Sequence, residues 1–211
     1  MTDFTGGAYE WLAWLPFTIA YLAGLPQILL NKHNNSTEGL SYRMVFFDYT
    51  GALTTTIYAF LLVLPFACRV MEPLCMLNIS LLVAQCFYYC KDKDARRFLI
   101  ASYVGLHAVA GLMLVVAWWH PVQIGMAMGW ISVVVQFFTQ LPQVLKNNAR
   151  RSVDGLSFVY ISLLGLSGLL EMTITFILAL PIQNFFNGLR AVGYYVVLCW
   201  QFGRYKKRRS S

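Results

Sequence analysis

Charged residues are scarce in this sequence. Asp, Glu, Lys and Arg make up 12% of its 211 residues, and hydrophobic residues make up 58%. Globular proteins average about 25% charged residues, so this chain has too few charged residues to cover the surface of a soluble protein. With a mean hydropathy of +0.58, the composition indicates a polytopic membrane protein.

Catalytic and metal-binding patterns are also missing. The three histidines (His33, His107, His120) are scattered, and neither H-E-x-x-H nor G-x-S-x-G occurs. The five cysteines are an odd number without metal-type spacing. A retinal-type pigment needs a lysine in its last helix, where this chain has Arg190. We therefore predict no enzyme, no metal site, no cofactor and no disulfide framework.

Long apolar runs dominate the rest of the chain. A helix needs about 20 apolar residues to cross the hydrocarbon. Seven segments qualify, of which the third and the seventh are the weakest because they carry Asn78 and Arg190. The segments are roughly 9–30, 42–66, 70–90, 97–119, 121–145, 157–180 and 182–203. The loops between them are short, so we expect one helical bundle.

The distribution of Lys and Arg predicts the orientation. Of the sixteen such residues, fourteen fall in the 1–2, 3–4 and 5–6 connections and the C-terminal tail. The opposite side has only Arg69, and Arg190 lies inside a span. Cytosolic loops are rich in Lys and Arg, so the N-terminus is expected outside and the C-terminus in the cytosol. The same distribution accounts for the net charge of +7 without nucleic acid. We favour a prokaryotic inner membrane over an organelle membrane.

An internal repeat organises the chain. LPQILLNKHNNSTEGLS at 25–41 and LPQVLKNNARRSVDGLS at 141–157 are identical at nine of seventeen positions, 116 residues apart. Trp14 and Trp130 keep the same offset. A fourth helix between the copies restores the chain direction, so the repeats are parallel. We predict an all-α membrane protein of two three-helix bundles (3+1+3), with residues 1–92 as the first triplet. Residues 93–120 form the linker helix, and 121–211 form the second triplet with a basic cytosolic tail.

Both copies read Pro-Gln followed by S-x-x-G-L-S. This pairing resembles the PQ-loop family, which includes the lysosomal cystine exporter cystinosin and cationic amino-acid exporters. The family shares its fold with the SWEET sugar-efflux transporters. The resemblance implies a transporter whose prolines act as hinges.

The chemistry of proline agrees with a hinge. Proline removes a backbone donor and loosens a helix. We therefore expect hinges at Pro26 and Pro142, with Gln27 and Gln143 bonding carbonyls that the break frees. Static kinks are the alternative.

Two carboxyl groups are predicted within the bundle, Asp48 and Glu171. A charge at the bilayer centre costs about 3 kcal/mol or more, so such groups normally face a cavity and have a task. Burial favours the neutral form of a carboxyl group, which permits proton uptake. The segment STEGLSYRMVFFDYTG resembles the cystinosin pattern in which an acid takes the coupling proton. In cystinosin that acid is in the second repeat, where this chain has Leu164 or Gly165. The alternative is an Asp48 satisfied by hydrogen bonds inside the bundle.

Further residues are candidates for binding a substrate. Thr55 and Tyr58 continue the helical face of Asp48. Arg190 is expected to pair with Glu171 or a substrate carboxylate, or to snorkel outward. Asn78 and Asn187, or Asn184 in place of Asn187, resemble an asparagine pair in sugar-efflux relatives. The repeated Trp14 and Trp130 are the remaining candidates, for which helix packing is equally favoured. His107 on the linker helix is expected to be a packing residue.

We thus predict a proton-coupled secondary transporter that works by alternating access. Its favoured substrate is a small polar solute, an amino acid or related zwitterion. A SWEET-type sugar uniporter and a cargo receptor of the KDEL-receptor type are the alternatives. The expected partners are the small-molecule substrate, protons and the lipid bilayer, and a homo-oligomer is left open.

Overall fold

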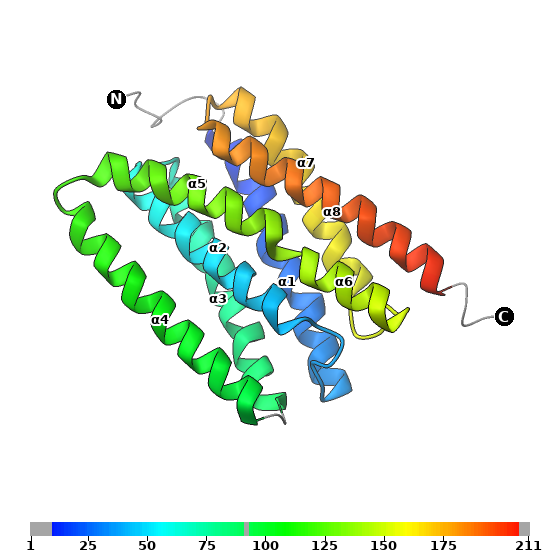
Figure 1. Ribbon diagram of the computed structural model, residues 1–211. Coiled ribbons are helices and arrows are strands. Elements are labelled where there is room, and N and C mark those ends of the chain that lie inside the picture. The colour runs from blue at the N-terminus through cyan, green and yellow to red at the C-terminus, as the bar shows by residue number, and fades with distance from the viewer. Residues whose placement is uncertain (1–9, 91–92, 207–211) are drawn as a thin grey trace.

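The computed structural model describes residues 10–90 and 93–206, and all regular structure in these ranges is helical. A short 3-10 turn, η1 (Glu10–Ala13), precedes the first helix. The α-helices are α1 (Trp14–Asn34), α2 (Tyr42–Leu61), α3 (Phe66–Tyr89), α4 (Lys93–Ala117), α5 (Pro121–Thr139), α6 (Leu141–Arg150), α7 (Phe158–Ile177) and α8 (Ile182–Lys206). Figure 1 shows them as one bundle of long helices.

The eight labels correspond to seven membrane spans in the described ranges, because α5 and α6 form one span that is interrupted at Gln140. The predicted all-α 3+1+3 fold is confirmed. By length and hydropathy alone, five stretches of the described residues qualify as spans, including Phe66–Tyr89. The two helices outside that set are α2 and α8, which supply Asp48 and Arg190. The prediction that the third span is among the weakest is therefore wrong, since α2 is weaker by hydropathy.

The helices of the two triplets form a ring. In the first triplet α3 packs against both α1 and α2, and in the second α8 packs against both α7 and α5. The triplets meet where α1 packs on α7 and α2 packs on α5. The linker helix α4 lies outside this ring, against α2 and α5 (Figure 1). The interior of the ring is therefore shared by the two repeats.

The repeat extends to individual backbone angles. Asn35 and Arg151 end α1 and α6 with φ of 46° and 50°. Val63 and Ala179, just after α2 and α7, have φ of 50° and 49°. Each pair is 116 residues apart. Positive φ is uncommon outside glycine and unfavourable for a β-branched residue such as Val63. The two copies therefore share one chain path at both ends of the bundle.

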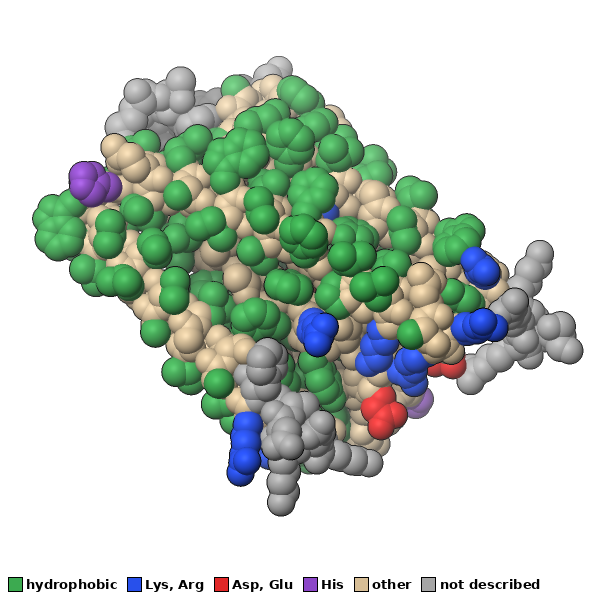
Figure 2. All heavy atoms as spheres, viewed as in Figure 1, with side chains coloured by type: hydrophobic (Ala, Val, Ile, Leu, Met, Phe, Trp, Pro, Cys, Tyr) green, Lys and Arg blue, Asp and Glu red, His purple; other side chains and the backbone are tan. Residues whose placement is uncertain are grey.

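The loops 35–41 and 151–157 define what we call the motif end of the bundle, and the loops 62–65 and 178–181 define the opposite end. Basic side chains gather at the motif end, where Figure 2 shows most of the visible Lys and Arg. They include Lys32, Arg43, Lys146, Arg150 and Arg204, whereas Arg69 lies near the opposite end. Lys91 and the basic tail 207–209 lie outside the described residues.

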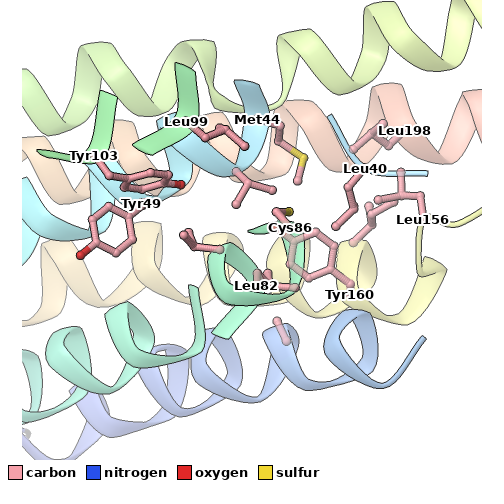
Figure 3. Close-up of a cluster of buried hydrophobic side chains, with 14 residues drawn as sticks. Leu40, Met44, Tyr49, Leu82, Cys86, Leu99, Tyr103, Leu156, Tyr160 and Leu198 are labelled. Atoms are coloured by element: carbon pink, nitrogen blue, oxygen red, sulfur yellow. The ribbon is translucent and has the colours of Figure 1, made fainter. Parts of the chain in front are cut away.

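Two apolar clusters fill the ring at different depths. The first includes Leu40 and Leu156 from the motif-end loops together with Leu82 and Tyr160 (Figure 3). The second includes Phe17 and is nearer the opposite end. Since burying a large apolar side chain contributes about 1.5–3 kcal/mol, these clusters hold the triplets together. A cavity lies between them.

Candidate functional site

Gln27 connects the first triplet to the loop of the second at the motif end. Its side chain is fully buried. Its Nε2 donates to the carbonyl oxygen of Gly155 at 2.9 Å, and its Oε1 accepts from the backbone N–H of Ser157 at 2.8 Å. Ser157 is also the N-cap of α7, with its Oγ accepting from Tyr160 N–H. Gln27 therefore fixes the start of a helix in the other repeat.

Gln143 makes the same connection in the reverse direction. It too is fully buried. Its Nε2 donates to the carbonyl oxygen of Gly39 at 3.0 Å, and its Oε1 accepts from Ser41 N–H at 2.7 Å. Ser41 caps α2 through Met44 N–H. We call these four reciprocal hydrogen bonds of Gln27 and Gln143 the glutamine lock.

The lock corrects the expected role of the two glutamines. They were predicted to bond carbonyls freed in their own helices, but both reach across to the other repeat. The prolines also differ from each other. Helix α1 continues through Pro26, whereas Pro142 begins α6 directly after the interruption at Gln140. A break in the helix therefore accompanies the second proline alone.

A second layer of amides supports each motif glutamine. In the first repeat, Gln27 Nε2 also donates to Asn31 Oδ1, and Asn31 Nδ2 donates to Gln85 Oε1 at 2.9 Å. In the second, Gln143 donates to Asn147, which donates to Gln201 at 2.8 Å. Sequence reasoning missed the glutamines of this layer, Gln85 and Gln201. These two glutamines are 116 residues apart, as Gln27 and Gln143 are, and this shared offset could have identified them.

The two motif-end loops touch through their glycines. A Cβ added to Gly39 would lie 2.4 Å from Cα of Gly155, closer than real Cβ contacts allow. Gly155 has φ +82°, which L side chains rarely adopt. From α6, Lys146 Nζ and Arg150 Nη1 both donate to the carbonyl oxygen of Glu38, at 2.6 and 2.7 Å. The motif end is thus closed by backbone contact and clamped by two cations.

A cavity of about 130 Å³ lies between the triplets, above this closed end. Residues from α1, α2, α3, α5, α7 and α8 line it, including Phe17 of one apolar cluster and Leu82 of the other. Four of the lining residues are acidic or basic: Asp48, Glu72, Glu171 and Arg190. The structure therefore brings the predicted Asp48, Glu171 and Arg190 into one site.

Arg190 is the cation of this site. Its guanidinium lies within electrostatic range of both Asp48 and Glu171. It donates over long distances of 3.4 Å to the carbonyl oxygens of Asn187 and Gln136. Since hydrogen bonds weaken beyond about 3.2 Å, these contacts leave the guanidinium free to bind other groups. Arg190 faces the cavity instead of snorkelling outward.

Glu72 is a carboxyl group that sequence reasoning missed. The third span was predicted to begin at residue 70, which placed Glu72 at the membrane border. Helix α3 begins at Phe66, so Glu72 lies more than one turn inside it and lines the cavity. The expectation of only two carboxyl groups within the bundle is wrong. The available signal was an acid followed by Pro73 in an otherwise apolar run.

The two predicted asparagines both line the cavity but are not repeat partners. Asn78 Nδ2 donates to the carbonyl oxygen of Tyr21, and Tyr194 Oη donates to that of Phe137. Both donors and both acceptors are 116 residues apart, so Asn78 corresponds to Tyr194. Asn187 is 5% exposed and its Oδ1 has no hydrogen-bond partner. Asn187 is the asparagine with free capacity for a ligand.

Two residues on α2 were predicted to bind substrate. Thr55 lines the cavity, where its hydroxyl contacts Ser132 Oγ and accepts from Gln136 Nε2 at 3.1 Å. Tyr58, one turn further, is buried outside the cavity lining, and its hydroxyl has no partner. Thr55 therefore lines the cavity with its hydroxyl already engaged, and Tyr58 does not line it.

The repeated tryptophans do not line the cavity. Trp14 and Trp130 are 37% and 44% exposed and pack against Phe66 and Phe186. On the linker helix, His107 contacts Tyr49 Oη at 3.0 Å. These side chains attach helices to one another and lie away from the cavity.

The cavity is not arranged as a metal site. Within residues 10–90 and 93–206, no three His, Cys, Asp or Glu side chains converge as ligands. The five cysteines all lie in these ranges and form no disulfide.

Comparison with known proteins agrees with the two repeats. The family model of the PQ loop repeat matches residues 8–67 and 124–184, more than half of the chain. The chain belongs to the PQ-loop repeat family. Each matched stretch contains one Pro-Gln motif and one S-x-x-G-L-S loop, so the predicted family is confirmed. No curated protein matches the sequence.

A solved structure has the same fold. The chain is similar to a eukaryotic SWEET transporter known at 3.7 Å resolution, with a TM-score of 0.67 and 14% identity. The match covers 95% of this chain and 100% of the other. At this identity the likeness establishes the fold, a multi-pass membrane bundle. It does not identify the substrate.

Proposed function

We propose that this PQ-loop protein is a proton-coupled secondary transporter that carries a small amino acid or related zwitterion by alternating access. The observation that supports this is a charged cavity between two repeats, with one end closed by reciprocal bonds between those repeats. Transporters built from repeats place substrate at such an interface. The proposal includes the division into 1–92, 93–120 and 121–211.

Orientation and compartment are part of the proposal. The basic residues at the motif end favour the cytosolic side there, with the N-terminus outside. The closed motif end then corresponds to a state that is sealed from the cytosol. A prokaryotic inner membrane remains the favoured location.

The glutamine lock supports a gate at the motif end. Its four hydrogen bonds contribute about 1 kcal/mol each, so the lock holds the closed state by a few kcal/mol. Reversing a two-state equilibrium from 1:99 to 99:1 takes about 5.5 kcal/mol. A substrate or proton that interacts differently with the two states is therefore able to open it.

Asp48 is the proposed proton carrier. Arg190 from α8, Tyr160 from α7 and Cys75 and Glu72 from α3 line the cavity with it. Charged, Asp48 attracts Arg190 across the ring; neutral, it frees the guanidinium for a substrate carboxylate. Glu171 is the second candidate, because it acts on Arg190 in the same way.

A sugar is the second candidate substrate. It is favoured by Asn78 and Asn187, which both line the cavity. The cavity volume weighs against it, because a cavity of about 150 Å³ holds a benzene-sized molecule of about six heavy atoms. A hexose has about twice as many heavy atoms, so a cavity of about 130 Å³ suits a small amino acid better.

Counterflow in liposomes that contain only this protein tests the proposal. A panel of labelled amino acids and sugars is exchanged against unlabelled solute inside. Exchange of small amino acids is the expected result. Exchange of sugars alone would overturn the choice of substrate. Binding without any exchange would favour a receptor of the KDEL-receptor type.

A further inference from the structure

The charges in the cavity do not balance. Three carboxyl groups (Asp48, Glu72, Glu171) share it with one guanidinium, that of Arg190. An unpaired charge in a low-dielectric interior is costly, so such a group is normally neutralised or paired. The excess of acid is therefore balanced either by protons on the carboxyl groups or by a cationic group that enters the site.

The imbalance is localised at Glu72. Arg190 acts on Asp48 and Glu171, which lie on α2 and α7. The charged neighbour that acts on Glu72 is Glu171, which repels it. Glu72 on α3 and Glu171 on α7 come from opposite triplets, so a cation between them would bridge the two repeats.

The hydrogen-bonding capacity points to the same kind of ligand. Asn187 lines the cavity, and its unpartnered Oδ1 is an acceptor. Ionised carboxylates are also acceptors only. The amide of Asn78 and the hydroxyl of Thr55 are already engaged within the bundle. Arg190 and the unpartnered hydroxyl of Tyr160 supply donors in the same cavity, so a donor-rich group of a ligand suits the carboxyl groups of Glu72 and Glu171.

We propose that Glu72 and Glu171 form an ammonium-binding subsite, and that a primary ammonium group is the feature this cavity requires of its solute. This inference rests on the proposed transport function and names its substrate class. The ammonium nitrogen donates to Glu72 and Glu171, whereas a carboxylate on the same solute is optional and lies toward Arg190. A metal ion is a poorer occupant, because in the described ranges no three ligating side chains converge.

The test compares three probes of similar size. Alanine carries an ammonium and a carboxylate, isopropylamine only the ammonium, and lactate only the carboxylate. Each is added to the purified full-length protein in detergent, and the melting temperature is measured across a titration. A ligand that binds the folded state alone raises the melting temperature with its concentration. Alanine and isopropylamine should raise it, and lactate should not.

Glu72→Gln is the decisive variant, because it keeps the shape of the side chain and removes its charge. Affinity for isopropylamine should fall about tenfold or more, as expected for a lost charge-assisted hydrogen bond. Glu38→Gln, at an exposed position in the motif-end loop, is the matched control and should bind as the unchanged protein does. A Glu72→Gln protein that melts normally shows that the fold is intact.

The outcomes separate this inference from transport itself. Equal binding of lactate, unchanged binding in Glu72→Gln, or no response to either amine would each overturn the ammonium subsite. Solute exchange that survives with any of these results would leave transport standing without the subsite. Amine binding without any exchange in liposomes would leave the subsite standing and end the transport proposal.

Discussion

Single residues divide into two groups by their relation to the repeat. The residues of the lock and its support are matched across the 116-residue offset, as in Gln27 and Gln143 or Gln85 and Gln201. The charged residues of the cavity are not matched. Asp48, Glu72 and Arg190 correspond to Leu164, Gly188 and Leu74 in the other copy. Matched residues connect the two repeats at the motif end, and unmatched residues give the cavity its charges.

This division explains which site residues the sequence could predict. Asp48 and Arg190 are visible because a charge in a long apolar run is rare. Glu72 was missed because the start of its helix was placed four residues too late. Trp14 and Trp130 were proposed for the substrate because they repeat, but repetition here indicates packing.

Gly39→Ala tests the contact between the loops. The added methyl group would lie 2.4 Å from Cα of Gly155, so the loops must separate and the closed motif end should lose population. In a variant without native cysteines, a cysteine at Leu156, a buried residue of the same loop as Gly155, reports the change by its rate of alkylation. We expect at least several-fold faster reaction.

The matched control for this glycine is Gly111→Ala, since a methyl group added there meets nothing within 4 Å. It should leave the alkylation rate unchanged. Equal rates in Gly39→Ala and Gly111→Ala would show that the loop contact does not hold the motif end closed.

At the scale of helices, the spans and their pairing were predictable, whereas their junctions were not. The apolar runs gave seven spans because the bilayer fixes the length of a spanning helix. The interruption at Gln140 was not predictable, because both repeats have the same Pro-Gln sequence and α1 does not break. Tertiary contacts of α6 with the first repeat's loop, through Lys146 and Arg150, distinguish the two copies.

Pro142→Ala should therefore slow transport more than Pro26→Ala. Both prolines leave a carbonyl without its helical donor. Helix α1 continues through Pro26, whereas the span of α5 and α6 is already interrupted just before Pro142. Alanine at 142 favours a continuous helix and should leave folding stability equal or higher. Counterflow rates and melting temperatures of both variants measure this. Unchanged flux in the double variant would make both prolines static kinks.

Gln143→Ala should weaken the lock from one side. The change leaves Gly39 C=O and Ser41 N–H without their partner, at about 1–3 kcal/mol for each buried group. The motif end should open, with faster alkylation at the same reporter cysteine. If the four bonds break together, the double variant with Gln27→Ala should destabilise the closed motif end by less than the sum of the two single variants. Strict additivity would indicate two independent contacts instead of one gate.

For the whole molecule, the ring of six helices around one cavity follows from the parallel repeat, which the sequence shows directly. The orientation in the membrane is a prediction from charge. Single cysteines at Thr5 and Ser210, which lie outside the described residues, should react with impermeant reagents from opposite sides. Reaction of both from one side would contradict the odd number of spans.

We propose that protonation of Asp48 couples solute movement to a pH gradient. The measurement is uptake of labelled solute into liposomes that contain only this protein, with the outside acidic. Protons that enter through Asp48 should drive accumulation in the unchanged protein. Asp48→Asn should keep exchange at equal pH but lose accumulation. Full gradient-driven accumulation in Asp48→Asn would show that Asp48 does not carry the coupling proton and would make Glu171 the candidate.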